Sequence, residues 1–600
     1  MNRRTQRCLP AGMCEIMSYD LVGNMLTRTD FNGRTTTYSY DVRNRQLTVG
    51  AALLAFPGEP GITRTYTATG KVASIVDASG TTTWTYDNQD RFLAKATPQG
   101  TLSYTYHPNS LVASVNSSNA NGTSVNYVYD PINRLTGVTD NRLGNTTTNV
   151  YDDSNNLAAI TYPNGIVHSY TVDQKDHVVG LQVQRNAAVL ANYGYTRAAT
   201  GAIQSAAENT GRGVNYTYDN AWRLTSETIA GDPVAANNGG LTYFLDAVAN
   251  RTSLTSTLAA LTNQTFSFDA NDRIAADTSD ANGNTLTSNS TIYTYDFLDR
   301  LSTATGGIAL VYDGDGNRVG RNTTHYLIDD QTPLGYTQVA EELVGGTVTR
   351  RYAYGLKRIS QTQVGNTTYY LYDGSGSVRA FADDTGSVTD TFTYDVFGNV
   401  TARTGITVSD TLYRGEHFDT GLGLYYLRSR WYGPQAGRFL TADKYEGERV
   451  LCCQWTRLSL VGATGIGAFT VHEQPGVHHG YTYADGDPVN MTDPTGRAAE
   501  RALSTQFTVT FSENAGIGGH GARHILGTIS REETEAIIEA AVREFLAEQE
   551  GAILVNTAWG NLQAMVQGVP YIYRLFILNA TVVNVGTYFP RLANYVPRRY

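Results

Sequence analysis

The sequence predicts a mainly β protein built from many short hairpins, and three observations carry this prediction. The chain is rich in Gly, Tyr, Thr and Asn, which is typical of strands separated by tight turns. Helix-forming residues are scarce before about residue 500. A strand-and-turn pattern recurs along most of the chain. At 600 residues the chain exceeds one ordinary hydrophobic core, so more than one structural unit is expected.

Charge, cysteines and hydropathy exclude several classes. The formal net charge of -10 argues against a basic nucleic-acid binder. Cys8, Cys14, Cys452 and Cys453 lack zinc-ligand spacing, and a disulfide scaffold is not expected in so long a chain. No apolar run is long enough for stable membrane insertion. Repeats begin by residue 17, so 1–16 is an atypical N-terminal segment, and domains are expected upstream of it.

The recurring unit is a strand of alternating aromatics that ends in Tyr-Asp or Phe-Asp. An Arg follows four residues after the Asp, and Gly-Asn turns lie between copies. Weaker copies end in Asp313, Asp373 and Asp395. The copies with this spacing are Asp41 and Arg45, Asp87 and Arg91, Asp130 and Arg134, Asp219 and Arg223, Asp269 and Arg273, and Asp296 and Arg300.

The physical chemistry of this unit predicts a β-hairpin. Tyr293 and Tyr295 lie two residues apart and therefore share one face of a strand. The Asp that follows opens a turn by accepting hydrogen bonds from backbone N–H groups. The Arg begins the return strand and can reach back to the Asp. One hairpin cannot bury its own face, so neighbouring hairpins must stack.

These residues resemble YD repeats, which occur in Rhs proteins, in the C components of insecticidal toxin complexes and in teneurins. The resemblance implies a YD-repeat hairpin sheet that spirals into a hollow shell, here over residues 17–415. It gives the repeat tyrosines and aspartates a role in hairpin packing and none in catalysis.

Two aromatic segments resemble the Rhs core-associated region, which implies a plug over residues 416–497. They are Tyr-Tyr-Leu-Arg-Ser-Arg-Trp-Tyr-Gly-Pro at 425–434 and Gly-Arg-Phe-Leu-Thr-Ala-Asp at 437–443. The sequence departs from the family pattern at Gly433, where Asp is usual, and at Lys444, where Pro is frequent. The segment 445–479 is also longer than the linker that is usual at this place in the family. It is either an insertion or a decayed copy.

The segment Pro-Val-Asn-Met-Thr-Asp-Pro-Thr-Gly at 488–496 resembles the motif that ends Rhs cores. The resemblance implies self-cleavage just after it by an aspartic-protease-like pair, in which one carboxyl keeps its proton. Asp443 is the first candidate, and Asp485 or Asp487 the second. Asp493 lies in the motif itself, and both Asp443 and Asp493 can equally be turn-capping residues. Arg497 stands where Leu is usual.

Residues 498–600 differ in composition and form a separate domain, which we expect to be a small α+β fold. This segment contains no Asp, Lys or Cys. An amphipathic helix is expected from the cap candidate Ser530 to Gly551. Strands are expected at 571–578 and 581–588. About one hundred residues is a reasonable size for one core.

The residues missing from 498–600 exclude several chemistries. Without Cys there is no cysteine nucleophile and no zinc deaminase site. Without Asp, a metal-dependent nuclease is poorly supplied with ligands, so no metal and no cofactor are expected. His520 and His524 are four residues apart and would share one face of a helical turn. Histidine suits general acid–base work near neutrality.

The two segments 518–524 and 586–591 resemble those of toxin ribonucleases of the barnase, EndoU and colicin superfamily and of RNase A-like toxins. The resemblance implies that His520 and His524 are the acid–base pair. Arg523, Thr587, Tyr588 and Arg591 would stabilise the phosphate and the developing charge. The alternative is structural: loop histidines, a strand threonine and a core tyrosine.

The resulting hypothesis is a secreted or surface toxin whose C-terminal ribonuclease is delivered into the cytoplasm of a competing bacterium. Its partners would be tRNA or another cellular RNA, a cognate immunity protein and the secretion machinery. One alternative is an ADP-ribosylating or other nucleotide-modifying toxin. The other is a non-enzymatic YD-repeat adhesion or interaction protein.

Overall fold

The computed structural model describes residues 3–51, 55–443 and 480–497, and the backbone of six strands between 500 and 590. The chain divides into two compact units, Met1–Thr505 and Gln506–Tyr600. Each unit is described by itself. The domain limits at 16/17, 415/416 and 497/498 stay predictions.

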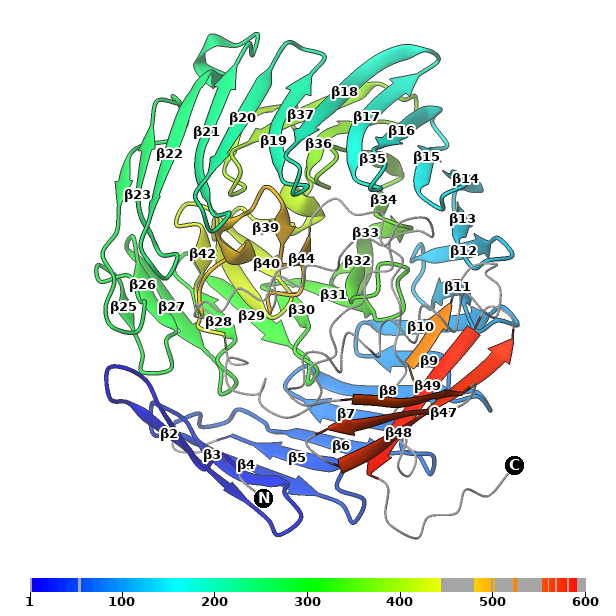
Figure 1. Ribbon diagram of the computed structural model, residues 1–600, viewed down its shortest axis with the longest axis vertical. Coiled ribbons are helices and arrows are strands. Elements are labelled where there is room, and N and C mark those ends of the chain that lie inside the picture. Colours follow the sequence, from blue (N-terminus) through cyan, green and yellow to red (C-terminus); the bar gives the residue numbers. More distant parts are fainter. Residues whose placement is uncertain are drawn as a thin grey trace. The chain divides into compact units, whose positions relative to one another are not determined.

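The first large sheet is a 24-stranded antiparallel meander in which each strand pairs with the next along the chain. Figure 1 shows these strands following one another from blue to green. The strands are β1 (Gln6–Cys8), β2 (Cys14–Tyr19), β3 (Met25–Thr29), β4 (Thr35–Tyr40), β5 (Gln46–Gly50), β6 (Ile62–Tyr66), β7 (Val72–Asp77), β8 (Gly80–Tyr86), β9 (Phe92–Thr97), β10 (Gly100–Tyr106), β11 (Val112–Ser117), β12 (Ser124–Tyr129), β13 (Leu135–Asp140), β14 (Asn145–Tyr151), β15 (Leu157–Thr161), β16 (Ile166–Val172), β17 (Val178–Arg185), β18 (Ala188–Arg197), β19 (Ile203–Glu208), β20 (Gly213–Tyr218), β21 (Leu224–Ala230), β22 (Gly239–Leu245), β23 (Arg251–Ser256) and β24 (Gln264–Thr265). A short helical turn, η1 (Ala235–Asn237), precedes β22.

The second large sheet continues the same meander with 14 strands. They are β25 (Thr278–Ser279), β26 (Thr285–Ser288), β27 (Thr291–Tyr295), β28 (Leu301–Ala304), β29 (Ile308–Tyr312), β30 (Arg318–Arg321), β31 (Thr324–Asp329), β32 (Gln338–Val344), β33 (Thr347–Tyr354), β34 (Arg358–Gln363), β35 (Asn366–Tyr372), β36 (Val378–Ala382), β37 (Val388–Tyr394) and β38 (Val400–Thr404). The predicted mainly β, hairpin-repeat fold class is therefore confirmed.

The predicted Asp-to-Arg contact forms in every one of the six strong copies. In the copy at Asp130, one carboxylate oxygen accepts the backbone N–H groups of Ile132 (3.1 Å) and Arg134 (2.9 Å). The other oxygen accepts the Arg134 Nε–H at 2.6 Å. Asn133 adopts a left-handed conformation at φ 70°, which asparagine tolerates better than most residues. One aspartate thus organises the whole turn.

The repeat tyrosine joins neighbouring hairpins, a role that the hairpin argument did not include. The hydroxyl of Tyr151 donates to the carbonyl of Leu135 in the preceding hairpin, at 2.9 Å. The guanidinium of Arg134 lies 4.6 Å from the centre of the Tyr151 ring, a favourable cation–π distance. Tyr66 repeats both contacts, with Gln46 and Arg45. Stacking of hairpins is therefore specific as well as hydrophobic.

The two large sheets share a buried core within the first unit. Leu102, Tyr104 and Val115 of the first sheet cluster with Leu327 and Ala340 of the second. Polar contacts accompany this packing. The Tyr104 hydroxyl donates to Asp329 at 2.9 Å, and Arg351 pairs with Asp140 at 3.1 Å.

The predicted plug region forms a separate small sheet that packs against both large sheets, through shared core clusters. Arg318 anchors it: this side chain is 1% exposed and lies 4.7, 4.8 and 5.3 Å from the rings of Tyr326, Tyr426 and Trp431. The plug elements are η2 (Tyr413–Gly415), β39 (His417–Asp419), β40 (Leu424–Leu427), β41 (Arg430–Gly433), β42 (Arg438–Phe439), η4 (Ala484–Gly486) and β43 (Met491–Thr492), with β44 (Glu500–Arg501) paired to β43.

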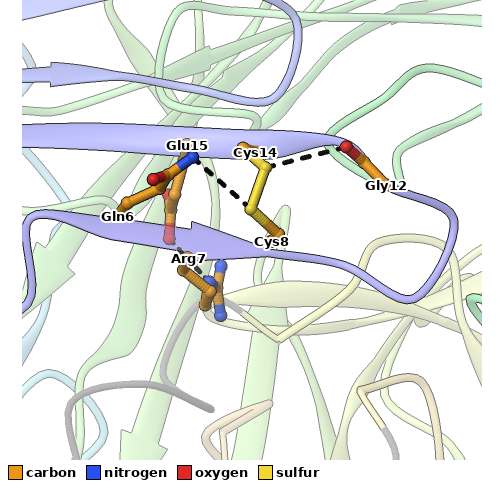
Figure 2. Close-up of a disulfide and its surroundings, with 6 residues drawn as sticks. All are labelled: Gln6, Arg7, Cys8, Gly12, Cys14 and Glu15. Carbon is orange, nitrogen blue, oxygen red and sulfur yellow. Dashed lines mark hydrogen bonds and ion pairs between the residues drawn. A yellow bond between two sulfur atoms is a disulfide. The ribbon is translucent and has the colours of Figure 1, made fainter.

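A disulfide closes the first hairpin, which the cysteine pattern did not predict. Cys8 and Cys14 are directly opposite in the β1–β2 register, with Cα atoms 4.0 Å apart (Figure 2). Beside them Glu15 forms ion pairs with Arg7 (2.6 Å) and Arg28 (2.8 Å). The expectation failed because a single cross-strand disulfide needs only two opposed cysteines, whereas the sequence argument considered a scaffold of several. Cys452 and Cys453 lie outside the described residues.

The second unit contains a five-stranded antiparallel sheet in the order β45-β49-β48-β47-β46. Its strands are β45 (Ala522–Ile525), β46 (Ile553–Ala558), β47 (Asn561–Val566), β48 (Val569–Asn579) and β49 (Val582–Pro590). The two predicted C-terminal strands correspond to β48 and β49. The helix expected at 530–551 lies outside the described residues.

Within the described part of the chain, no helix has the length and apolar character needed to cross a bilayer.

Candidate self-cleavage site and payload strands

Two of the four predicted self-cleavage aspartates come together on one arginine. Arg430, the first residue of β41, is 8% exposed. Its Nη2 lies 3.2 Å from a carboxylate oxygen of Asp443 and 3.5 Å from one of Asp493. These two aspartates are far apart in sequence, so the fold alone brings them together. We call this group the Arg430 bracket.

The Arg430 bracket also holds the backbone on both sides of the segment that the structure leaves undescribed. Arg430 Nη1 donates to the Gly480 carbonyl at 2.7 Å, and Nε donates to the Gly496 carbonyl. The backbone N–H of Asp443 donates to the same Gly480 carbonyl at 2.8 Å. The guanidinium carbon lies 3.7 Å from the centre of the Phe439 ring. The residues before and after 444–479 are therefore tied to one side chain.

The Asp-Pro-Thr-Gly turn at 493–496 is held from within as well. Asp493 is 2% exposed, and its carboxylate accepts the Arg497 backbone N–H at 2.9 Å and the Thr495 hydroxyl at 3.4 Å. Gly496 has φ 67°, and a Cβ there would lie 2.5 Å from the Leu427 carbonyl oxygen. Only glycine meets both conditions without strain. Asp493 therefore acts as a turn-capping residue, which was one of its two expected roles.

The charges of the bracket differ from those of an isolated carboxyl pair. Two neighbouring carboxylates repel, and one then keeps a proton. Here a guanidinium lies between them and offsets that repulsion. As arranged in the structure, Asp443 and Asp493 are ion-pair partners of Arg430, which also holds the backbone at Gly496.

Asp487 makes different contacts and has a perturbed pKa. Its carboxylate accepts the side-chain N–H of Asn490 at 2.9 Å. Burial raises the pKa of Asp487 to about 6, against hydrogen bonds from Asn490 that lower it. Asp485 lies in the η4 turn at φ 51°. Asp487 therefore keeps its proton to a higher pH than a solvent-exposed aspartate does.

Sequence reasoning missed Arg430, which connects Asp443, Asp493 and the backbone at Gly480 and Gly496. The only signal was its place in the aromatic-rich stretch at 425–434. An arginine there is equally compatible with cation–π packing, so its two carboxylate partners could not be inferred.

In the second unit, strand pairing brings two of the predicted ribonuclease segments together. Arg523 and His524 lie in β45, opposite Asn584 and Val583 of β49. Thr587 and Tyr588 follow on the same β49 strand. The helical turn expected for the histidine pair is wrong at 522–525, because these residues are extended and pair with β49. His520 and Arg591 lie outside the described residues.

No group of three or more His, Cys, Asp or Glu side chains suited to a metal ion occurs among the residues that the structure describes.

Comparison with protein families and curated proteins identifies the repeats. Residues 27–237 match the family model of the teneurin YD-shell. The chain is 30% identical over 233 residues to the tRNA3(Ser)-specific nuclease WapA of Bacillus spizizenii, covering 36% of this chain and 9% of that protein. It is 28% identical over 258 residues to the tRNA(Glu)-specific nuclease WapA of Bacillus subtilis subsp. natto, covering 40% and 10%. The matches thus span about a tenth of these relatives.

Solved structures show the same fold. The crystal structure of TcdB2-TccC3 is similar over 80% of this chain and 28% of that chain, with a TM-score of 0.62 at 16% identity. The form without the hypervariable C-terminal region gives a TM-score of 0.63, also at 16% identity, over 80% and 27%. Together with the Asp-Arg hairpins, these similarities show a YD-repeat shell fold: the family model covers residues 27–237, and the structural similarity covers 80% of the chain.

Proposed function

We propose that this chain carries a metal-independent ribonuclease toxin at its C-terminus, from about residue 498, behind a YD-repeat shell. The similarity to relatives named as tRNA nucleases supports the ribonuclease class. The absence of Asp and Cys from 498–600 favours chemistry that needs neither a metal nor a cysteine.

The pairing of β45 with β49 is the observation that carries the proposal. It sets the backbone of His524 and Arg523 beside the strand that contains Thr587 and Tyr588. In the proposed reaction His520 and His524 serve as base at the RNA 2′-OH and as acid at the 5′-oxygen. Arg523, Thr587, Tyr588 and Arg591 stabilise the phosphorane charge. The product is a 2′,3′-cyclic phosphate.

The proposed partners follow from this reaction. The substrate is RNA, with tRNA favoured by the names of the relatives. A producing cell that makes such an enzyme needs an immunity protein, and delivery to another cell needs export machinery.

Inducible expression of 498–600 in bacteria tests the proposal, with the full chain in parallel. Wild type should arrest growth and fragment RNA, while His520→Ala and His524→Ala should lose both effects. A loss of about 100-fold or more in cleavage rate is typical when an acid–base group is removed. In the full chain His325→Ala serves as the matched control, because His325 is exposed on β31.

Other outcomes identify the rival functions. Growth arrest with intact RNA would support a nucleotide-modifying toxin instead. No arrest from any form would leave the adhesion or interaction protein as the better reading.

We further propose that the chain cuts itself just after the turn at 493–496. The Arg430 bracket favours this, because it fixes Asp443, Asp493 and the Gly496 carbonyl around one residue. Intact-mass measurement of purified full chain should find a C-terminal fragment that Asp443→Asn, Asp493→Asn or Asp487→Asn diminishes. Asp153→Asn, on an exposed repeat turn, should cut like wild type. Equal cutting in all four variants would overturn the role of these aspartates.

A further inference from the structure

Two buried arginines line one small, partly open cavity where the first sheet meets the plug. Arg251 begins β23 and is 6% exposed, and Arg438 begins β42 and is 9% exposed. Both side chains line the cavity, together with Phe266, Phe397 and Thr482. The site therefore combines residues separated by almost two hundred positions.

The hydrogen-bond acceptors of these arginines are neutral. Arg251 Nη2 donates to the Gln264 side-chain oxygen at 3.1 Å and to the Gln435 carbonyl. Its Nε and Nη1 have no hydrogen-bond partner among the described residues. Arg438 donates to the Asn250 side-chain oxygen at 3.4 Å and to the Asp272 carbonyl.

Aromatic rings offset part of the free-energy cost of burying the two guanidinium groups. The Arg251 guanidinium lies 4.9 Å from the centre of the Phe397 ring, and Arg438 lies 4.5 Å from that of Tyr481. Ring faces attract a cation by about 2 kcal/mol or more when desolvated, but they offer no acceptor for an N–H group in the plane of the guanidinium. Burying an unpaired charge costs several kcal/mol. Burial accordingly lowers the pKa of Arg438 to about 10 and also lowers the pKa of Arg251.

The cavity is large enough for one water molecule or one monatomic ion. Its volume is about 20 Å³, and a buried water needs on the order of 10–15 Å³. Phosphate, sulfate and nucleotides are therefore too large. A monatomic anion fits. It would accept hydrogen bonds from the two unpartnered N–H groups of Arg251 and would also attract both guanidinium groups, whereas water would only accept the hydrogen bonds.

We propose that Arg251 and Arg438 bind a small monovalent anion of the chloride class, which ties the plug to the first sheet. The ion accepts hydrogen bonds from Nε and Nη1 of Arg251 and is shielded by the rings of Phe266 and Phe397. Gly437 adjoins the site: a Cβ there would lie 3.0 Å from Arg251 Nη1, so this glycine keeps the approach open.

Unfolding of the full chain in urea, followed by tryptophan fluorescence, tests the site. Sodium chloride is compared with sodium gluconate at equal ionic strength, because gluconate is too large for the cavity. At ten times its dissociation constant, an anion that binds only the folded state raises the folding constant about tenfold. Chloride should therefore raise the urea midpoint of wild type saturably.

Two variants and one diffraction measurement complete the test. Arg251→Met should lose the chloride response, and Arg28→Met should keep it, because Glu15 retains Arg7 there. An equal response in all three proteins would overturn the site. If Arg251→Met fails to fold, anomalous diffraction from wild-type crystals soaked in bromide tests the site instead. An anomalous peak beside Arg251 supports the proposal, and no peak there refutes it.

Discussion

A single aspartate organises the turn in each of the six strong repeat copies, and a single arginine connects that turn to the next hairpin. Asp130 accepts two backbone N–H groups and the Arg134 side chain, while Arg134 also stacks on Tyr151. This position therefore needs the planar guanidinium group with its several N–H donors, and the ammonium group of a lysine is not equivalent. The same reasoning explains Arg430, whose three nitrogens serve two carboxylates and two carbonyls.

At the residue scale, Arg134→Lys should lower the free energy of unfolding by about 1.5–3 kcal/mol, the range for a hydrogen bond to a charged group. Lysine keeps the charge but loses the Nε contact to Asp130 and the stacking on Tyr151. Urea unfolding measures the difference. Arg43→Lys, on an exposed turn position, should change stability by less than about 0.5 kcal/mol. A similar loss in both variants would contradict this account.

At the scale of the element, the hairpin is the unit that the sequence repeats. The first hairpin differs from the others in the contacts that stabilise it. Strand β1 pairs with β2 alone, so it lies at an edge of the sheet. The Cys8–Cys14 disulfide and the Glu15 ion pairs hold this edge (Figure 2). Interior hairpins instead have neighbours on both sides, which explains why they need no covalent link.

Reduction of this disulfide should loosen the first hairpin without unfolding the sheet. Closing a loop of this length, with a sequence separation of 6, restricts the unfolded chain by about 2 kcal/mol. Hydrogen exchange of the amides in β1 and β2 should therefore speed up by roughly 30-fold in Cys8→Ser/Cys14→Ser. Amides of β12 and β13 serve as the internal reference and should not change. Faster exchange throughout both pairs of strands would indicate global destabilisation instead.

At the scale of the whole first unit, contacts between the two large sheets bury carboxyl groups. Glu227 of β21 accepts the Val396 backbone N–H at 3.0 Å and faces Tyr243, Asp395 and Arg212. Burial, then the charge of Asp395, raises the pKa of Glu227 to about 8. Burial likewise raises the pKa of Asp329 and of Asp395 to about 6. These groups are protonated in the folded state at low pH.

Stability of this unit should therefore fall as pH rises from about 4 to above 8. A carboxyl whose folded pKa is raised stabilises the fold below its unfolded pKa, near 4, and loses that contribution as pH passes the folded value. Glu227 alone accounts for about 3–5 kcal/mol at 1.36 kcal/mol per pKa unit. Urea midpoints between pH 5 and pH 8.5 measure the slope.

Glu227→Gln should flatten this pH dependence, because glutamine keeps a carbonyl acceptor for Val396 and does not ionise. Asp153→Asn, on an exposed turn, should leave it unchanged. The hairpin aspartates act in the opposite sense at lower pH. The Arg45 hydrogen bond lowers the pKa of Asp41, so its contribution is lost as pH falls. An unchanged slope in Glu227→Gln would contradict the assignment.

The candidate sites show where sequence reasoning ends. The Asp41–Arg45 type of contact spans four residues, so local turn chemistry predicted it. Asp443 and Asp493 were both proposed, but their common partner was not, because Arg430 reaches Gly480 across 50 positions and Gly496 across 66. For the histidine pair, the four-residue spacing was considered as a helical turn, whereas residues 522–525 pair with β49 as a strand.

The sequence by itself determined the hairpin, its turn and its repetition, because each depends on residues a few positions apart. The alternation of Tyr293 and Tyr295 and the Asp-to-Arg spacing are sufficient for that. Only the tertiary structure decided which hairpins of the two large sheets pack against each other, because no single repeat encodes its partner in the core. The Arg430 bracket and the Arg251–Arg438 cavity belong to this second class. The bracket forms only when distant parts of the plug fold together, and the cavity forms only when the plug packs against the first sheet.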